Sequence, residues 1–394
     1  MSGRPRPGPG APAREDVIGL VSSLVAIDSV NPSLVAGGAG EGAIAAFIAG
    51  WARDAGLEVE ILEETPGRPS VLVRARGTGG GRTLMLCGHV DTVGVEGMAA
   101  PFMPAQRDGR LYGRGAQDMK GGVAAMIDAA RVLATGGLAA GRLIVAAVVD
   151  EEYASLGADA LVTEWQADAA VVTEPTDLEI AIAHKGFAWF EVETRGRAAH
   201  GSRPADGRDA ILRMGRVLQR LEGLDRALQS RAPHALVGLP SLHASIVNGG
   251  RELSSYPDRC VLQFERRTIP GESDEVVKDE LSRILAALSE ADAEFDAEGH
   301  LLFARPSYEL AAGHPLVAAA VRAVTAATGR ALDVCGMSFW TDAAVLGGSG
   351  IPSNLFGPGG AGLHSTEEYV RIADVLACRD VLVALARDWC QRTN

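Results

Sequence analysis

Apolar residues along this chain follow two patterns that alternate with each other. Helical spacing covers residues 15–27 and 41–56, and a third helical segment at 121–137 ends in two glycines. Short extended or continuously apolar segments of strand length stand between them, at residues 58–64, 70–76, 83–89, 142–150 and 167–175. Such segments alternating with helices predict an α/β fold, with a mostly parallel sheet covered by helices on both faces.

The pattern changes near residue 185. Residues 185–200 alternate between apolar and polar, as a half-exposed strand does. A helix at 209–223, alternating strands at 243–250 and 260–269, and a helix at 273–289 follow. This order predicts an α+β domain with an antiparallel sheet. After about residue 305 the sequence again predicts helices and buried strands, as it does before residue 185.

We therefore expect an α/β domain that is interrupted by a smaller α+β domain and then resumed. The predicted boundaries are a disordered lead-in at 1–14, the first part of the α/β domain at 15–185, the insert at 186–302, and the second part at 303–394. The lead-in is rich in proline, glycine and arginine, and it lacks the apolar segment of a secretion signal.

Composition narrows the class of protein. The chain has 394 residues, of which 47% are apolar, and a net charge of −13, which argues against a nucleic-acid-binding surface. No stretch reaches the ~18 consecutive apolar residues of a membrane span. The five cysteines are scattered without CxxC spacing, which is typical of free thiols in a reducing compartment. We expect a cytoplasmic protein without nucleic-acid or membrane partners.

Ionisable residues follow the ends of the predicted buried strands. His89 and Asp91 end the first long apolar run, and Glu174 follows a later one. Two further positions lie in glycine-rich loops, Asp118 before a helix and His364 after the apolar run 353–356. The acidic triplet after residue 149 is Asp150, Glu151 and Glu152. Because ligands of open α/β sheets bind outside the carboxyl ends of the strands, these groups are expected to converge.

Several carboxylates in one cleft need compensating positive charge, and cations supply it most simply. Two histidines and three carboxylates are oxygen and nitrogen ligands that suit zinc, cobalt or manganese. Five ligands are too many for one tetrahedral site, but they fit two metals that share a bridging carboxylate.

Simpler interpretations exist for each residue taken alone. His89 beside Asp91 is compatible with a structural histidine held by a carboxylate, and a single glutamate after a strand is usually a helix cap or solvated. The joint pattern is far rarer by chance, because every group falls at the same kind of position. The glycines at 77–81 lack the spacing of a phosphate loop, and residues 347–351 do not form the GxSxG turn of a serine hydrolase.

Six motifs occur in the order found in the dinuclear zinc amidohydrolase and metallopeptidase family. They are GHVDTV, GRGAQDMKGG, DEEYASLGADAL, TEP, AAHGSRPADGRDAI and PGGAGLHSTEEYV. The chain resembles this family over roughly residues 15–390. The family includes acetylornithine deacetylase, succinyl-diaminopimelate desuccinylase, aminoacylase and glutamate carboxypeptidase. The resemblance implies a zinc-peptidase-like catalytic domain and an inserted lid domain that usually mediates homodimerisation.

The resemblance also implies a role for each matched residue of the catalytic domain. His89 and Glu174 match ligands of the first metal, and Asp91 matches the partner that orients His89. Asp118 matches the bridging carboxylate, typically followed by a cis peptide, here to Met119. Glu151 matches the general base. Glu152 and His364 match ligands of the second metal.

In the insert, the resemblance makes His200 an oxyanion-stabilising histidine that reaches the partner subunit's active site, and Arg267 a ligand for the substrate carboxylate. Arg266 is expected to face the other way, because neighbours on a strand alternate. The chain departs from the family pattern at Ser254, often asparagine, and at Leu363, often alanine. The first departure bears on substrate contacts, and neither changes a metal ligand.

The function implied is hydrolysis of the amide bond of an N-acyl amino acid by a metal-activated water, of the acetylornithine deacetylase or succinyl-diaminopimelate desuccinylase type. The expected cofactors are two divalent ions per chain, zinc first, with cobalt or manganese as alternatives. A carboxypeptidase or dipeptidase with the same centre is the alternative. A binding module that had lost activity would have a broken ligand set, whereas here the ligands and the base are all present.

Overall fold

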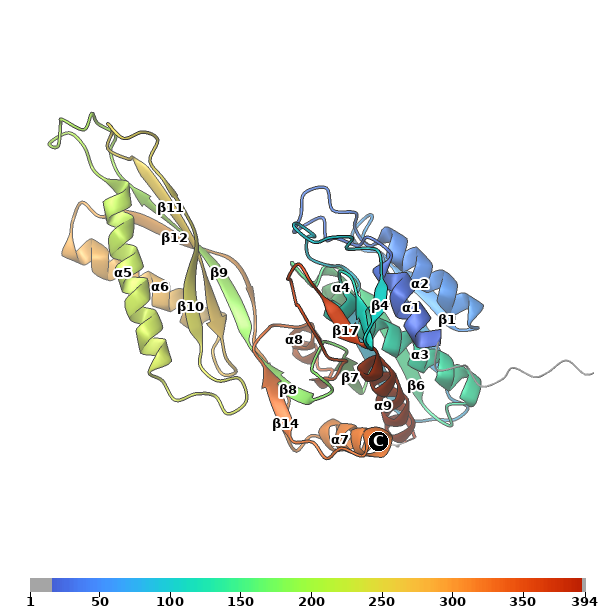
Figure 1. Ribbon diagram of the computed structural model, residues 1–394. Helices are drawn as coiled ribbons and strands as arrows, with labels where there is room; N and C mark the ends of the chain where they lie inside the picture. The colour runs from blue at the N-terminus through green and yellow to red at the C-terminus, as the bar shows by residue number, and fades with distance from the viewer. Residues whose placement is uncertain (1–15, 392–394) are drawn as a thin grey trace, which may run out of the picture. The chain divides into compact units, whose positions relative to one another are not determined.

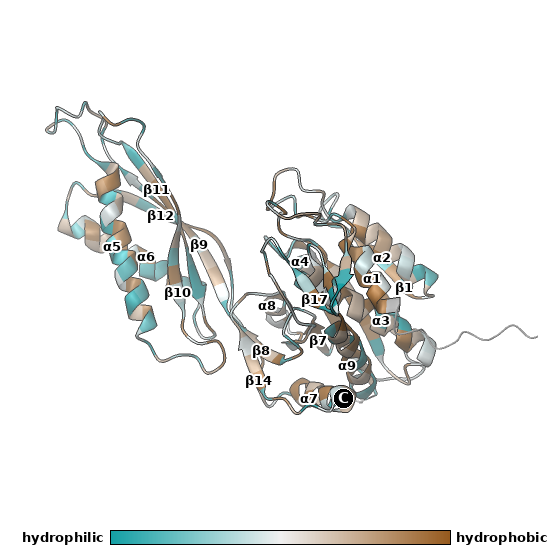
Figure 2. Cartoon of the chain, viewed as in Figure 1, coloured by the Kyte–Doolittle hydropathy of each residue, from teal (hydrophilic) through white to brown (hydrophobic). Residues whose placement is uncertain are grey.

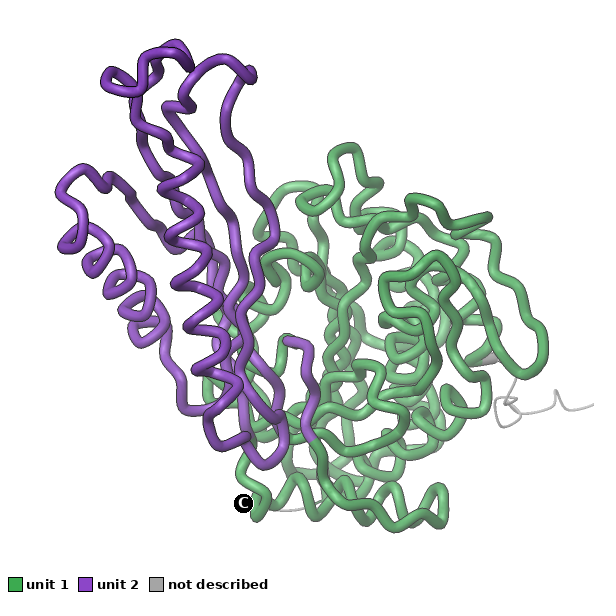
Figure 3. Tube along the Cα trace, turned by 60° about the vertical axis from the view of Figure 1, so that its left-hand side comes forward, with its two compact units in different colours: residues 1–182, 310–335, 341–394 green, residues 183–309, 336–340 purple. Residues whose placement is uncertain are grey.

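The computed structural model describes residues 16–391, so the predicted lead-in at 1–14 lies outside the described residues. The described chain forms two compact units (Figure 3). The first contains the residues up to Ile182, Leu310–Cys335, and those from Thr341 onward. The second contains Ala183–Glu309 and Gly336–Trp340. The chain thus leaves the first unit, builds the second and returns to the first.

The first unit is built on a large mixed sheet. In spatial order its strands are β1 (Glu58–Leu62), β2 (Ser70–Arg76), β6 (Arg142–Val148), β3 (Thr83–His89), β7 (Ala169–Val172), β15 (Ser353–Leu355) and β8 (Ile180–His184). The central strands β6, β3, β7 and β15 are parallel, whereas β1, β2 and β8 pair antiparallel with their neighbours. The short strands β13 (Tyr308–Glu309) and β14 (Val334–Met337) pair with β8.

Helices cover both faces of this sheet (Figure 1). α3 (Gly121–Gly136) leads from β3 to β6, and α4 (Leu156–Glu164) leads from β6 to β7, in the opposite direction along the sheet. Because such crossovers are almost always right-handed, the two helices belong on opposite faces. α9 (Ile372–Cys390) packs on α3, and α8 (Ala343–Gly348) packs on α4. The predicted α/β fold with a mostly parallel centre is confirmed.

The remaining elements of the first unit lie around this core. The helices are α1 (Asp16–Val25), α2 (Gly42–Asp54) and α7 (Pro315–Thr328). A second, small antiparallel sheet has the order β16 (Gly360–Ala361), β17 (Tyr369–Arg371), β5 (Arg110–Tyr112) and β4 (Ala105–Arg107). A turn, η1 (Ala116–Lys120), with non-helical backbone at Asp118 and Met119, precedes α3. The loop between β16 and β17 carries His364, so this sheet, which was not predicted, helps to place a site residue.

The second unit is an antiparallel sheet with helices on one face. Its order is β10 (Ser241–Gly249), β11 (Arg259–Thr268), β9 (Gly186–Arg195) and β12 (Asp296–Arg305). The helices are α5 (Ala210–Gln229) and α6 (Asp274–Ala291), and their apolar sides share a core with the sheet. Phe190 of β9 stacks on Phe264 of β11 with ring centroids 5.1 Å apart in this core. The predicted inserted α+β fold is confirmed.

Hydrophobic and hydrophilic residues alternate along α5, as expected for a helix with one buried side (Figure 2). The strands of the first unit are more uniformly apolar, because both faces of its sheet are covered: β6 is buried from Leu143 to Val148. Among the described residues, none of the helices has the length and apolar character needed to cross a membrane.

Candidate dinuclear metal centre

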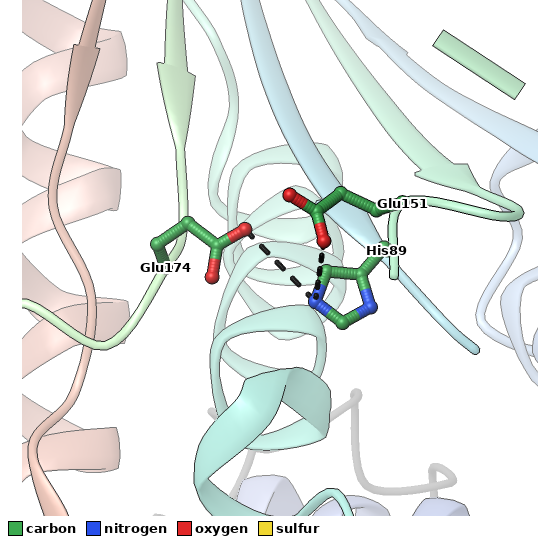
Figure 4. A group of neighbouring side chains, drawn as sticks. All are labelled: His89, Glu151 and Glu174. Atoms are coloured by element: carbon green, nitrogen blue, oxygen red, sulfur yellow. Dashed lines mark ion pairs between the residues drawn. The ribbon is translucent and has the colours of Figure 1, made fainter. Parts of the chain in front are cut away.

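Three parallel strands deliver ionisable residues to one edge of the main sheet. β3 ends at His89, β6 is followed by Glu151, and β7 is followed by Glu174. Figure 4 shows both carboxylates directed toward the imidazole. The Nε2 atom of His89 lies 3.9 Å from Oε2 of Glu151 and 3.9 Å from Oε1 of Glu174. The parallel register therefore brings together residues that are far apart in the sequence.

Asp118 lies between the two histidines and presents one carboxylate oxygen to each. Its Oδ1 atom is 3.1 Å from Nε2 of His89, and its Oδ2 atom is 3.4 Å from Nε2 of His364. The same nitrogen of His364 lies 3.2 Å from Oε2 of Glu152. The peptide bond from Asp118 to Met119 is cis. The two carboxylate oxygens of Asp118 therefore face one histidine each, and its bridging role stays a prediction.

Asp91 holds the backbone of the acidic loop more than the imidazole. The closest acceptor for Nδ1 of His89 is the main-chain carbonyl of Asp91 at 3.0 Å, whereas the Asp91 carboxylate is 3.5 Å away. The carboxylate instead accepts the backbone N–H groups of Glu151 and Glu152, each at 3.2 Å. A proton on Nδ1, donated to this carbonyl, is the arrangement that would leave the lone pair of Nε2 available to a metal ion.

The electrostatics of the cluster show an excess of negative charge. Burial raises the pKa of Glu151 and of Glu174 well above the ordinary range of a glutamate. Hydrogen bonds with Asp118 and Glu152 raise the pKa of His364 to about 10. Oε1 of Glu174 is buried and has no hydrogen-bond partner among the described residues. Four carboxyl groups, of Asp118, Glu151, Glu152 and Glu174, thus surround two imidazoles, which is a charge pattern typical of a cation site.

The donor set fits such cations. Ligand atoms of His89, Glu151 and Glu174 lie within 4.8 Å of one another, and so do those of His89, Asp118 and Glu152. Nitrogen and oxygen donors of this kind suit zinc, cobalt or manganese. Glu151 and Glu174 are equally far from His89, so distance alone does not tell a ligand from a base.

Three residues at the site were not predicted from the sequence. The Asn31 amide donates to Asp91 at 2.8 Å and to Asp150 at 3.0 Å, and Arg68 donates to Asp150 at 2.8 Å. Glu368 accepts the backbone N–H of Asp118 at 3.1 Å. Glu368 stands four residues after His364, so its place in the same motif was the one available signal.

The predicted residues of the insert lie in the second unit. His200 is exposed, and its Nδ1 atom is 2.8 Å from the hydroxyl of Ser202. Arg267 donates through Nε to Glu265 at 2.6 Å, and its terminal nitrogens have no hydrogen-bond partner among the described residues. Arg266 is buried with Glu272 and Glu280, on the helix-covered side of the sheet. The roles of His200 and Arg267 stay predictions.

Comparison with known protein families matches residues 85–388 to the peptidase family M20/M25/M40. Acetylornithine deacetylase of Myxococcus xanthus is 34% identical over 321 residues, covering 80% of this chain and 82% of that protein. N-formyl-4-amino-5-aminomethyl-2-methylpyrimidine deformylase of Bacillus subtilis (strain 168) is 26% identical and covers 96% of both chains.

Solved structures share the fold across nearly the whole chain. A tripeptidase from Staphylococcus aureus has a TM-score of 0.81 at 20% identity, covering 97% of this chain and 100% of its own. A dinuclear metal-binding peptidase of the M20 family from Bacillus subtilis has a TM-score of 0.74 at 17% identity, covering 96% and 99%. The chain therefore belongs to the peptidase family M20/M25/M40 and is a hydrolytic enzyme that acts on amide bonds.

Proposed function

We propose that the enzyme uses two divalent metal ions, zinc in the first place, to remove the acyl group from an N-acyl amino acid. The observation that carries the proposal is that two histidines and four acidic residues converge around Asp118 at one edge of the sheet. The similar sequences support this choice of substrate class, since their names specify removal of an acetyl group and of a formyl group.

The residues that would hold the first metal are His89, Asp118 and Glu174, and Asp118, Glu152 and His364 would hold the second. When bound, such metals would supply Lewis acidity and lower the pKa of a coordinated water. The same residues would hold zinc, cobalt or manganese in the same roles. The tests below therefore include all three metals.

Glu151 is the proposed general base and acid. Burial raises the pKa of Glu151, which suits a group that must accept a proton near neutral pH and then release it. We assign it the proton of the attacking water, which it returns to the leaving amine. Asp91 positions this base, because its carboxylate holds the backbone N–H of Glu151.

The second unit would contribute to substrate recognition and to assembly. Arg267 would bind the substrate carboxylate through its terminal nitrogens, and His200 would donate a hydrogen bond to the developing oxyanion. β10 pairs on one side only, with β11, and exposes Ile246 and Val247, which are 53% and 57% accessible. Because unpaired apolar strand edges invite pairing with another chain, we propose that this edge joins two copies.

The variant Glu151→Gln tests the catalytic assignment. It keeps the size of the side chain but removes the proton acceptor, so kcat falls by about 10²–10⁴-fold or more. Metal content, measured by inductively coupled plasma mass spectrometry, stays at two ions per chain. Glu164→Gln, an exposed change on α4, serves as control and leaves both values as in the unaltered protein. A Glu151→Gln enzyme that remains fast contradicts the assignment.

The substrate class is tested with a panel of N-acetyl and N-succinyl amino acids beside dipeptides. Faster turnover of dipeptides would favour the alternative, a carboxypeptidase or dipeptidase with the same centre. Chelation is expected to abolish turnover and added zinc, cobalt or manganese to restore it. A protein that binds no metal after reconstitution would refute the proposed function.

The shared site is tested by subunit exchange. If His200 acts across a dimer, a mixture of His200→Ala and Glu151→Gln chains regains part of the activity that each lacks alone. Val247→Glu on β10 is expected to give monomers by light scattering, because it places a charge on the pairing edge. Mixtures that stay inactive contradict a shared site, and a dimeric Val247→Glu protein contradicts this interface.

A further inference from the structure

Glu368 is a buried acid that the proposed chemistry does not use. Its Oε1 atom accepts the backbone N–H of Gln117 at 2.8 Å and of Asp118 at 3.1 Å. Its Oε2 atom accepts the backbone N–H of Gly115 at 3.0 Å. One buried carboxylate thus accepts three main-chain N–H groups in the short segment that ends at Asp118.

Arg114 completes this arrangement from the other side. Its Nη1 atom donates to Oε2 of Glu368 at 2.7 Å, and its Nη2 atom donates to the main-chain carbonyl of Ser365 at 2.9 Å. The Arg114 and Glu368 side chains are 4% and 0% exposed, so water competes little for these bonds. The guanidinium therefore links the loop before Asp118 to the loop that carries His364.

The backbone at His364 needs such support. His364 has φ of 56°, in the left-handed region that residues other than glycine rarely occupy. Its neighbour Ser365 is tied to Arg114, and the backbone N–H of Gly113 donates to the carbonyl of Glu368 at 3.1 Å. The ion pair of Arg114 and Glu368 thus joins two loops that are about 250 residues apart in sequence.

We propose that Arg114 and Glu368 are a pair of positioning residues that set the affinity of the second metal position, formed by Asp118, Glu152 and His364. The inference rests on the proposed function, because it presupposes that this position binds a metal. Asp118 and His364 come from the two loops that the pair joins. The first position relies more on His89 and Glu174, which follow directly from strands β3 and β7.

The expected loss of metal affinity follows from the effect of ligand-orienting residues at other metal sites. Removing a residue that orients metal ligands typically weakens metal affinity by about 10–100-fold. In Glu368→Gln, one carboxylate oxygen becomes an amide N–H₂ group, which faces donors either from Arg114 and Gly115 or from Gln117 and Asp118. The variant cannot satisfy both sets, so we expect the second metal to bind about 10–100-fold more weakly while the first changes less.

The test is a titration of metal-free protein with Zn²⁺, followed by calorimetry, with Co²⁺ absorption as a second probe of ligand geometry. Glu367→Gln is the matched control, because Glu367 is the neighbouring glutamate, its side chain is 71% exposed, and it forms a surface ion pair with Arg107 at 3.5 Å. Arg114→Lys is the second variant. It keeps the positive charge beside Glu368 but loses the hydrogen bond to Ser365. If Glu368→Gln does not fold, Arg114→Lys tests the same inference.

The expected result is two binding events in the unaltered protein and in Glu367→Gln, and a selectively weakened second event in Glu368→Gln and Arg114→Lys. Excess metal is expected to restore kcat in both variants, which a general loss of structure would not allow. Unchanged affinity for the second metal in a folded variant overturns the inference. Absence of two binding events in the unaltered protein overturns the proposed function instead.

Discussion

Arg68 is a nearly buried cation of the first unit that pairs with two buried acids. Its side chain is 9% exposed and donates to both oxygens of Glu41, at 2.6 and 2.7 Å, and to Asp150 at 2.8 Å. Both acids are fully buried. Burial alone would lower the pKa of Arg68, but the hydrogen bonds with Glu41 and Asp150 raise it above its ordinary value, so the guanidinium is charged.

The variant Arg68→Met leaves two buried carboxylates without their shared cation. Removing one partner of a buried ion pair costs about 3–5 kcal/mol, because the remaining charge stays desolvated. A unit of this size loses about 2–4 °C of melting temperature per kcal/mol, so the first unit melts about 6–20 °C lower. Adding Glu41→Gln removes one of the uncompensated charges, and the double variant is expected to recover part of this loss.

Differential scanning calorimetry of metal-free protein measures the effect without a contribution from bound ions. Arg76→Met is the matched control, because the pair of Arg76 and Glu58 is 3.1 Å long but its side chains are 57% and 51% exposed. Such surface pairs contribute about 0–1 kcal/mol. If Arg68→Met lowers the melting temperature no more than Arg76→Met does, the argument from buried charge is wrong. Since Asp150 directly precedes Glu151, we also expect kcat to fall in Arg68→Met.

The remaining predictions concern stability. Burial lowers the pKa of His184 to about 4, below the ~6.5 of an unfolded histidine, so the unfolded chain binds the extra proton between these values. The protein should therefore lose about 2 kcal/mol of stability between pH 7 and pH 5. His184→Asn should reduce this pH dependence, whereas His243→Gln, at an exposed position, should not. Gly122→Ala should destabilise α3, because its Cβ would meet the carbonyl oxygen of Thr173 at 2.1 Å. Gly50→Ala, in open space on α2, should raise the melting temperature by a few degrees, and a fall there would contradict the reasoning.

The fold and the cluster of acids could be predicted because their signals are local. Each buried strand is a short apolar run, and the first polar residues after it, such as His89 or Glu174, lie by geometry at the carboxyl edge of the sheet. A local signal misled in one place. The helix predicted at 209–223 is too short, because α5 continues to Gln229 and Leu228 in this extension is buried.

The supporting residues could not be predicted, because their partners are distant in sequence. Arg68 and Asp150 are 82 residues apart, and Arg114 and Glu368 are 254 residues apart. Nothing in the residues around Arg68 marks it as buried, since a single arginine after a turn is normally solvated. Only the folded chain brings it to Glu41, and only then does its charge acquire a function.

Several buried acids of the first unit differ in what neutralises them. Arg68 pairs with Glu41 and Asp150, and Arg114 pairs with Glu368, at distances of 2.6–2.8 Å. Glu151 and Glu174, in contrast, have no arginine or lysine within ion-pair distance anywhere in residues 16–391.

This difference has a chemical consequence. An arginine beside Glu151 would lower its pKa and make it a poor proton acceptor, and one beside Glu174 would occupy the space of a cation. The chain places arginines on Glu41, Asp150 and Glu368, and none on Glu151 or Glu174, which face His89. This difference supports the proposal that bound cations supply positive charge to the centre. The distribution of arginines is thus a second argument for bound metals, independent of the ligand geometry.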